Sequence, residues 1–321
     1  MSLGSFRYVL AIFVLTSHLW AGMPQGFAAY AVWGFFLLSG FLMTLVLNEK
    51  YTFSTTGIKK YFYNRALRIY PMYWIAMILG SGTMLYLNTL QYDFKQLNHE
   101  FGFPDTLVNW VSNIVLLPTY FLENPVPVAN ALRIEVFYYF IIILLAIDKR
   151  IAWLGFFVGL VWNIYLLFIS YSEKVDTFGL RYATLGPCSI AFAGGAILYH
   201  YKSFFGRFSN KNLSLITWML NGLIWFKLPQ YPWGIGIYIS LALSAWVVIS
   251  LYKEKANKMD LILGDLSYPV YLLHSTLGLI LMPYFKEFRS IEFMFWGFIL
   301  TNVISFISIQ LVDQPIKKLK I

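Results

Sequence analysis

Long apolar runs separated by short polar segments fill most of the chain. A helix needs about 20 apolar residues to cross a hydrocarbon core about 30 Å thick. The pattern therefore predicts an all-α fold, a polytopic bundle of transmembrane helices. The candidate runs lie at residues 5–22, 27–47, 69–88, 107–122, 130–147, 151–171, 182–200, 213–228, 234–252, 266–285 and 291–312.

The run at 107–122 is the weakest of these, because it carries Asn109, Asn113 and Pro118 and leads into the proline-rich ENPVPVAN. Cytoplasmic loops are enriched in Lys and Arg. If this run does not cross, 17 of the 24 Lys and Arg residues fall inside and 7 outside, whereas a crossing gives 12 on each side. We therefore expect ten spans with both termini cytoplasmic, and a segment 107–122 that is re-entrant or lies against the outer side.

Composition supports a membrane protein and excludes several other classes. Of the 321 residues, 59% are hydrophobic and 12% charged, against about 25% charged in soluble domains. The net charge of +9 is spread between apolar runs instead of forming one basic face, which argues against nucleic acid as a partner and for a membrane surface. The single Cys188 excludes an internal disulfide and a multi-cysteine metal site, and we expect no metal.

One arginine and one histidine interrupt the first run, FRYVLAIFVLTSHLW. Arg7 and His18 are separated by about 16 Å along a helix and by almost three whole turns, so they share one face. In a membrane, Arg7 would lie at one interface and His18 well inside. The alternative is an arginine that extends to the interface and a histidine that only packs.

Arg65 and Arg68 also share a helix face, at positions i and i+3, where they could bind one or two phosphate groups. The alternative is a positively charged anchor on the cytoplasmic side. Glu135 is the most deeply placed carboxylate, and its depth agrees with that of His18 within about 5 Å, so a contact is geometrically possible. Otherwise Glu135 pairs with Arg133 or with backbone.

A third polar stripe lies in LGDLSYPVYLLH. Ser267, Tyr271 and His274 stand at i, i+4 and i+7 on one helix face, which indicates a secondary pocket. Polar groups satisfied by helix packing are the competing account. Cys188, among small residues, is more typical of inert packing than of a nucleophile.

Together these segments resemble the acyltransferase 3 family, the integral-membrane enzymes that acylate bacterial surface glycans. The resemblance rests on Arg7 with His18, GFFLLSGFL, RALRIYP from Arg65, RIEVFYYF around Glu135, LSYPVYLLH and the terminal DQP. It implies a bacterial inner-membrane O-acyltransferase that uses acyl-CoA, in the first place acetyl-CoA, as a co-substrate and has no permanently bound cofactor. It also implies a glycan acceptor such as lipopolysaccharide O-antigen or a lipid-linked glycan. We expect one transmembrane domain over 1–321, with any extra-membrane domain supplied by a separate partner protein.

Within this resemblance each candidate residue has an expected role. Arg7, Arg65 and Arg68 would bind acyl-CoA, and His18 would act as base or nucleophile with Glu135 orienting its ring. Tyr271 and Ser267 are weaker candidates for stabilising the oxyanion, with His274 in the same secondary pocket. A proton-coupled transporter of a lipid-linked sugar or small solute is the alternative, since buried Arg, His and Glu would serve it equally.

Overall fold

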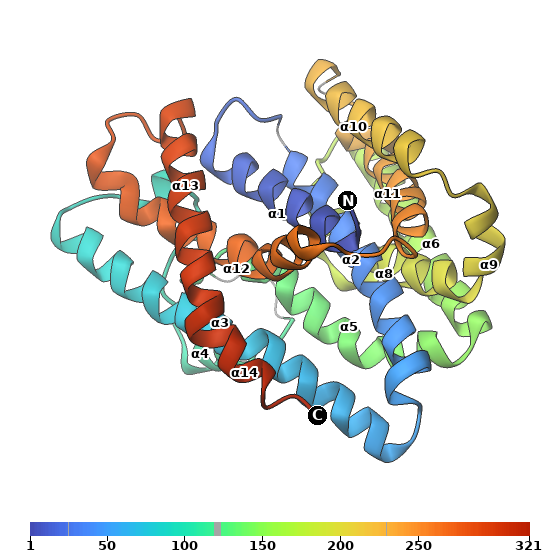
Figure 1. The fold of residues 1–321 in the computed structure, drawn as a ribbon. Helices are drawn as coiled ribbons and strands as arrows, with labels where there is room; N and C mark the ends of the chain where they lie inside the picture. The colour runs from blue at the N-terminus through green and yellow to red at the C-terminus, as the bar shows by residue number, and fades with distance from the viewer. Residues whose placement is uncertain (25, 119–122, 229) are drawn as a thin grey trace. The chain divides into compact units, whose positions relative to one another are not determined.

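The computed structural model describes residues 1–24, 26–118, 123–228 and 230–321 (Figure 1). Their regular secondary structure is helical, apart from one isolated bridge between Phe101 and Asn124. A helix covers all or part of every apolar run predicted from the sequence. The predicted all-helical architecture is therefore confirmed for the described residues.

The helices group into two compact units, each assembled from segments that are distant in the sequence. Unit 1 comprises residues 1–3, 24–61 and 134–256, and unit 2 comprises residues 4–23, 62–133 and 257–321. Unit 1 contains α2 (Phe27–Val46), η1 (Leu47–Tyr51), α6 (Lys149–Glu173), α7 (Phe178–Ala183), α8 (Leu185–His200), α9 (Lys202–Phe205), η3 (Gly206–Phe208), α10 (Lys211–Lys227), η4 (Pro232–Gly236) and α11 (Ile237–Leu251). Unit 2 contains α1 (Leu3–Leu19), η2 (Phe94–Gln96), α4 (Leu107–Ile114), α12 (Lys258–Leu281), η5 (Met282–Tyr284), α13 (Ile291–Ser308), η6 (Ile309–Asp313) and α14 (Gln314–Lys317). Helices α3 (Thr55–Thr89) and α5 (Ala129–Ile147) contribute to both units, and the first residue of α1, Leu3, belongs to unit 1.

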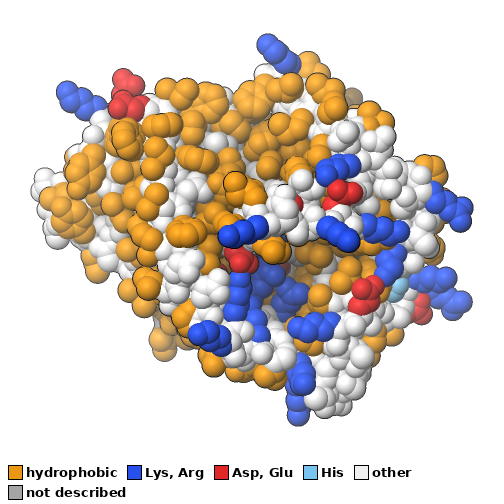
Figure 2. Space-filling model, in the orientation of Figure 1, with side chains coloured by type: hydrophobic (Ala, Val, Ile, Leu, Met, Phe, Trp, Pro, Cys, Tyr) orange, Lys and Arg blue, Asp and Glu red, His pale blue; other side chains and the backbone are white. Residues whose placement is uncertain are grey.

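Length and composition make this a helical membrane protein. In the described part of the chain, six helical segments are long and apolar enough to cross a membrane, namely Phe27–Tyr51, Ala129–Ile147, Lys149–Glu173, Trp233–Leu251, Lys258–Tyr284 and Ile291–Lys317. Figure 2 shows hydrophobic side chains over much of the visible face, as expected of helices surrounded by lipid. The number of ten spans and the cytoplasmic termini stay predictions.

Close helix contact in unit 1 depends on glycine. A Cβ at Gly40 of α2 would lie 2.2 Å from the Phe192 carbonyl oxygen of α8, and one at Gly195 would lie 2.2 Å from the Leu37 carbonyl oxygen of α2. Small residues of this kind let transmembrane backbones approach, which is the main source of packing energy where both solvent and side chains are apolar.

We expect Gly195→Ala to destabilise the protein and Gly194→Ala, one residue earlier on the same helix, to leave it unchanged or more stable. Both substitutions gain about 1 kcal/mol of helix propensity. A Cβ at Gly194 would meet the Leu37 side chain at an ordinary 3.6 Å. A Cβ at position 195 would collide with the backbone of α2, which costs about 1–3 kcal/mol or more. Melting temperatures of the two variants in detergent check this, and equal values would contradict the packing account.

The segment predicted not to cross begins with a short helix. Helix α4 has 8 residues, about 12 Å, which is too short to span a bilayer. The carbonyl groups at its carboxyl end would be costly to leave unpaired in an apolar layer. Three aromatic donors from α3 bind them: Tyr73 Oη to Asn113 O at 2.8 Å, Trp74 Nε1 to Ile114 O at 2.9 Å, and Tyr70 Oη to Val115 O at 2.9 Å. Residues 119–122 of this segment lie outside the described residues.

We expect a cysteine at position 149 to react with a membrane-impermeant maleimide only after the cells are permeabilised, so that the reagent reaches the cytoplasmic side of the membrane. Helix α6 begins at Lys149 and ends at Glu173, and both side chains are exposed, so Glu173→Cys is the matched variant for the opposite face. The single native Cys188 is buried and should remain silent. If position 149 is labelled in intact cells, the predicted orientation of all spans after residue 107 is wrong and must be reversed.

Candidate active site

The two histidines singled out from the first and the tenth apolar run lie in contact in unit 2. His18, in the last turn of α1, and His274, on α12, have ring centroids 5.2 Å apart with an interplanar angle of 64°. His274 is fully buried, whereas His18 keeps part of its surface accessible. The sequence assigned them to separate places, and the structure makes them one pair.

The hydrogen bond of His274 indicates its tautomer. Its Nδ1 lies 3.2 Å from the Val270 carbonyl oxygen, which can only accept, so Nδ1 is assigned the proton. Its Nε2 then carries a lone pair, and it has no hydrogen-bond partner among the described residues. The Nε2 atom of His274 can therefore accept a hydrogen bond or a proton from a neighbouring donor.

Arg289 fixes the end of the helix that carries His18. Its Nη2 donates to the Ser17 carbonyl oxygen at 2.9 Å, and its own carbonyl oxygen accepts from the Ala21 amide at 2.8 Å. The Arg289 backbone adopts a left-handed conformation with φ of 59°, which is strained for a residue with a side chain. A cation at the carboxyl end of a helix complements its unpaired carbonyls. The guanidinium also interacts electrostatically with His18.

The other two residues of the predicted secondary pocket donate to backbone. Ser267 Oγ binds the Gly264 carbonyl oxygen of its own helix at 2.7 Å, and Tyr271 Oη binds the Val128 carbonyl oxygen at 2.7 Å. The Tyr271 ring lies 6.4 Å from that of His274, so it belongs to the surroundings of the pair. Stabilisation of an oxyanion by either hydroxyl would require it to change partner.

Glu135 has partners of its own in unit 1. Its Oε1 accepts from Ser39 Oγ at 2.9 Å and from Tyr139 Oη at 3.1 Å. Arg133, two residues earlier, binds Asn113 instead, so the alternative pairing of Glu135 with Arg133 is not formed. His18 belongs to unit 2, and its contact with Glu135 stays a prediction.

Arg65 and Arg68 lie on α3 beside basic residues from the end of the chain. Lys320 interacts electrostatically with both arginines and with Lys317. Two hydrogen bonds between the Asn64 side chain and the Ile321 backbone hold the tail there. Asn64 Nδ2 donates to Ile321 O at 2.5 Å, and Ile321 N donates to Asn64 Oδ1 at 3.1 Å. We call Arg65, Arg68, Lys317 and Lys320 the basic cluster.

Two carboxylates only partly neutralise the basic cluster. Asp265 forms an ion pair with Lys317 at 2.6 Å, and Asp313 interacts with Lys317, Lys320 and Arg68. Partial burial, followed by the positive charges of Arg68, Lys317 and Arg65, lowers the pKa of Lys320 despite the opposing effect of Asp313. The excess of positive charge makes the cluster a favourable place for an anion. Arg7 is half-buried on α1, and its participation stays a prediction.

The comparison with known protein families decides what this arrangement belongs to. A family model described as an acyltransferase domain matches residues 2–310, nearly the whole chain. The chain belongs to the acyltransferase 3 family. The resemblance noted in the sequence is thereby confirmed, and the protein is an acyltransferase of multi-pass membrane type. No curated protein and no solved structure matches the chain.

Three residues of this acyltransferase were missed as site candidates from sequence. Arg289 stands in an ordinary loop, and Lys317 and Lys320 belong to a basic tail that indicated only sidedness. No spacing or motif distinguishes them, because their neighbours Ser17, Arg65 and Arg68 are remote in the chain. Among the described residues, no group of three or more His, Cys, Asp or Glu side chains is placed to hold a metal ion.

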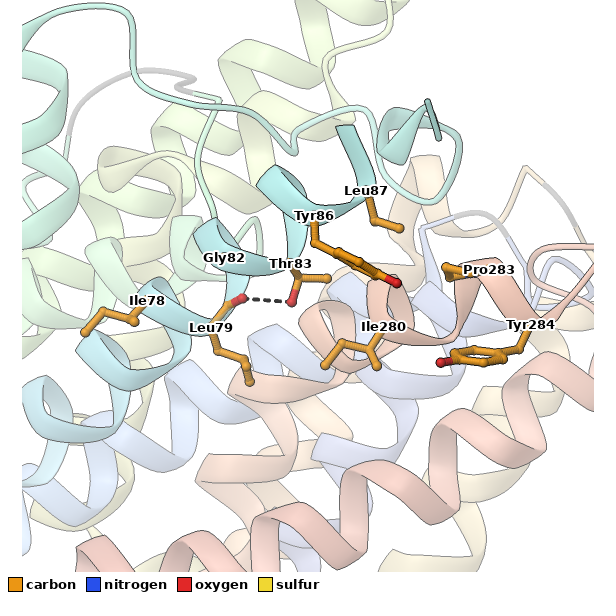
Figure 3. Close-up of a pocket in the computed structure, with 9 residues that line it drawn as sticks. All are labelled: Ile78, Leu79, Gly82, Thr83, Tyr86, Leu87, Ile280, Pro283 and Tyr284. Carbon is orange, nitrogen blue, oxygen red and sulfur yellow. Dashed lines mark hydrogen bonds between the residues drawn. The ribbon is translucent and has the colours of Figure 1, made fainter. Parts of the chain in front are cut away.

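The acyltransferase also has an apolar hollow in unit 2, away from the charged residues. It measures about 370 Å³ and lies between α3 and the end of α12 with η5 (Figure 3). Its lining is Ile78, Leu79, Gly82, Thr83, Tyr86, Leu87, Ile280, Pro283 and Tyr284. The Thr83 hydroxyl is occupied by the Leu79 carbonyl oxygen at 2.8 Å. Such a surface suits a hydrocarbon chain and not the phosphates of a nucleotide.

Proposed function

We propose that this acyltransferase moves an acyl group, acetyl in the simplest case, from acyl-CoA to a hydroxyl group of a cell-surface or lipid-linked glycan. The observation that carries the proposal is the His18 and His274 pair, two imidazoles in contact at the core of unit 2 in a chain of this family. The proposed setting is the bacterial cytoplasmic membrane, with lipopolysaccharide O-antigen among the possible acceptors and a separate protein supplying any extra-membrane domain.

The basic cluster supports acyl-CoA as the donor. Coenzyme A carries a pyrophosphate and a separate phosphate, and guanidinium groups bind such oxygens through paired, charge-assisted hydrogen bonds. Arg65 and Arg68 would supply these bonds, and Lys317 and Lys320 would add charge that the two carboxylates leave unbalanced. Arg7 is the further donor contact that we propose from the sequence.

His18 is the residue that we assign to the chemical step. As a base it would take the proton of the acceptor hydroxyl while that oxygen attacks the thioester carbonyl, and the coenzyme A thiolate would leave and recover the proton. As a nucleophile it would attack the thioester carbonyl and expel the coenzyme A thiolate, and the acceptor hydroxyl would then attack the resulting acyl-imidazole, release the imidazole and pass its proton to the thiolate. Either route needs a partner that orients the ring, for which His274 is in contact and Glu135 is the proposed carboxylate.

We expect His18→Asn to reduce acyl transfer by about 10² to 10⁴, the usual contribution of a general base, with donor binding and folded yield near normal. Asparagine keeps similar size and hydrogen bonding but does not titrate near neutral pH. Thiol release from acetyl-CoA by the purified protein in nanodiscs measures this. A proton-coupled transporter would release no thiol in the absence of a gradient.

His200→Asn is the matched control, because His200 lies on a unit 1 helix and binds the Leu145 carbonyl oxygen at 2.9 Å. His274 is unsuitable as an independent control, since it contacts His18. We expect His274→Asn to cost less than His18→Asn. If His18→Asn stays active while His274→Asn is inactive, the chemical role moves to α12.

We expect Arg65→Ala and Arg68→Ala each to weaken acyl-CoA binding by about tenfold to a hundredfold, since a charge-assisted hydrogen bond contributes about 1.5 to 3 kcal/mol. Lys320→Gln should have a smaller effect in the same direction. Isothermal titration with acetyl-CoA measures the affinities, and Arg150→Ala, an exposed arginine at the start of α6, is the control. Unchanged affinity would indicate that both arginines serve only as positively charged anchors on the cytoplasmic side.

A further inference from the structure

Arg133 is a buried cation that the proposed reaction leaves unused. It stands in the second turn of α5, with a side chain only 1% exposed. Its Nη2 donates to Asn113 Oδ1 of α4 at 2.5 Å, and the Tyr73 hydroxyl group lies beside the guanidinium. Nε and Nη1 have no hydrogen-bond partner among the described residues.

An arginine in this state is costly to bury. Each unpaired donor of a charged group loses its water and gains nothing in return, which makes such groups rare unless an anion completes them. Asn113 is a neutral acceptor and the Tyr73 hydroxyl already donates to the Asn113 carbonyl oxygen. These contacts orient the guanidinium without neutralising it.

Glu100 is an acidic residue that interacts electrostatically with Arg133, but its carboxylate does not bind the free guanidinium donors. It interacts with Arg133 electrostatically, yet the two form no ion pair in the described residues, and its Oε2 accepts from Asn130 Nδ2 at 3.1 Å instead. Burial raises the pKa of the Glu100 carboxyl, against the opposing effects of His99, Asn130 and Arg133. Arg133 therefore has no ion-pair partner among the described residues.

The same element connects Arg133 to the histidine pair. Tyr271, whose ring neighbours that of His274, donates to the Val128 carbonyl oxygen immediately before α5. Arg133 follows Val128 by about 7 Å of helical rise. Arg133 and the histidine pair therefore belong to the same unit and are linked through Tyr271 and the start of α5.

A second buried arginine shows how such a cation can be stabilised without an anion. Arg181 of unit 1 is also 1% exposed and also leaves Nε and Nη1 without a hydrogen-bond partner among the described residues. It differs in its surroundings, because its guanidinium lies 5.6 Å from the Phe178 ring centroid and binds the Trp233 carbonyl oxygen. A cation over an aromatic face is stabilised without any anion. Arg133 makes no cation–π contact with any of the described residues.

We infer that Arg133, held by Asn113, binds an anionic group of the acceptor, a carboxylate or a phosphate, so that the acceptor is an acidic or phosphate-bearing glycan. This inference rests on the proposed function for the identity of the acceptor. The guanidinium donors match the oxygens of either group, and a neutral sugar would leave the charge unpaired.

Binding of three small probes to the purified protein in nanodiscs tests the inference. The probes are glucuronate, glucose 1-phosphate and glucose, each titrated with saturating coenzyme A present so that the basic cluster is occupied. We expect one or both anions to bind and raise the melting temperature, and glucose to do neither. A response to glucuronate alone indicates an acidic sugar, and a response to glucose 1-phosphate alone indicates a phosphate-linked acceptor.

Three variants make the result specific. Arg133→Gln should weaken anion binding at least tenfold, Arg133→Lys should give an intermediate loss, and Arg181→Gln should leave the affinity unchanged even if it lowers stability. If Arg133→Gln fails to fold, the Arg133→Lys and Arg181→Gln comparison still decides. Absence of anion binding in the parent protein, or equal loss in Arg133→Lys and Arg181→Gln, would overturn the inference.

The failure of this inference is distinguishable from failure of the proposed function. Thioester turnover from acetyl-CoA is measured on the same preparations and depends on His18, not on Arg133. Turnover without anion binding would remove only the acidic acceptor, whereas anion binding without turnover would remove the acyl-transfer role and leave Arg133 as an anion site.

Discussion

The close packing of α1 against α12 is the interaction on which the candidate active site depends. A Cβ at Gly4 would lie 2.4 Å from the Asp260 carbonyl oxygen, and one at Gly278 would lie 2.8 Å from Leu19. Contacts near both ends keep the two helices side by side in the same direction, and Ser5 adds a hydrogen bond to the Asp260 carboxylate. Since both helices are apolar over most of their surface, close approach and a few polar contacts, not burial from water, decide this geometry. The ring contact of His18 with His274 follows from it.

Polar groups within the apolar helices explain much of the remaining architecture. A short helix such as α4 can end in an apolar layer only where donors meet its last carbonyl groups, and the aromatic residues of α3 provide these donors. Arg289 serves the end of α1 in the same way. At Arg133 two buried donors have no acceptor among the described residues. A ligand that supplies acceptors there would gain more binding free energy than at a site whose polar groups are already paired.

Positive charge is concentrated in the basic cluster, which also belongs to unit 2. The basic cluster combines residues of α3 with the last residue of α14 and the tail that follows it, and two nearby carboxylates neutralise only part of its charge. The proposed reaction thus has a donor region built from exposed and half-buried cations and a transfer centre built from imidazoles. An enzyme that binds a polyanionic donor and reacts at a neutral hydroxyl needs both regions, because phosphate binding and proton abstraction require different environments.

The sequence by itself determined the features that depend on neighbouring residues. Apolar length located the helices, and the i, i+3 spacing placed Arg65 and Arg68 on one face, because helix geometry is a local property. Asn109, Asn113 and Pro118 marked the weak run that proves to begin with a short helix. The tertiary structure alone decided that His18 meets His274, that Lys320 joins Arg68, and that Asn113 holds Arg133. In a membrane a helix is apolar on nearly every side, so its hydrophobic pattern does not tell which face meets which partner.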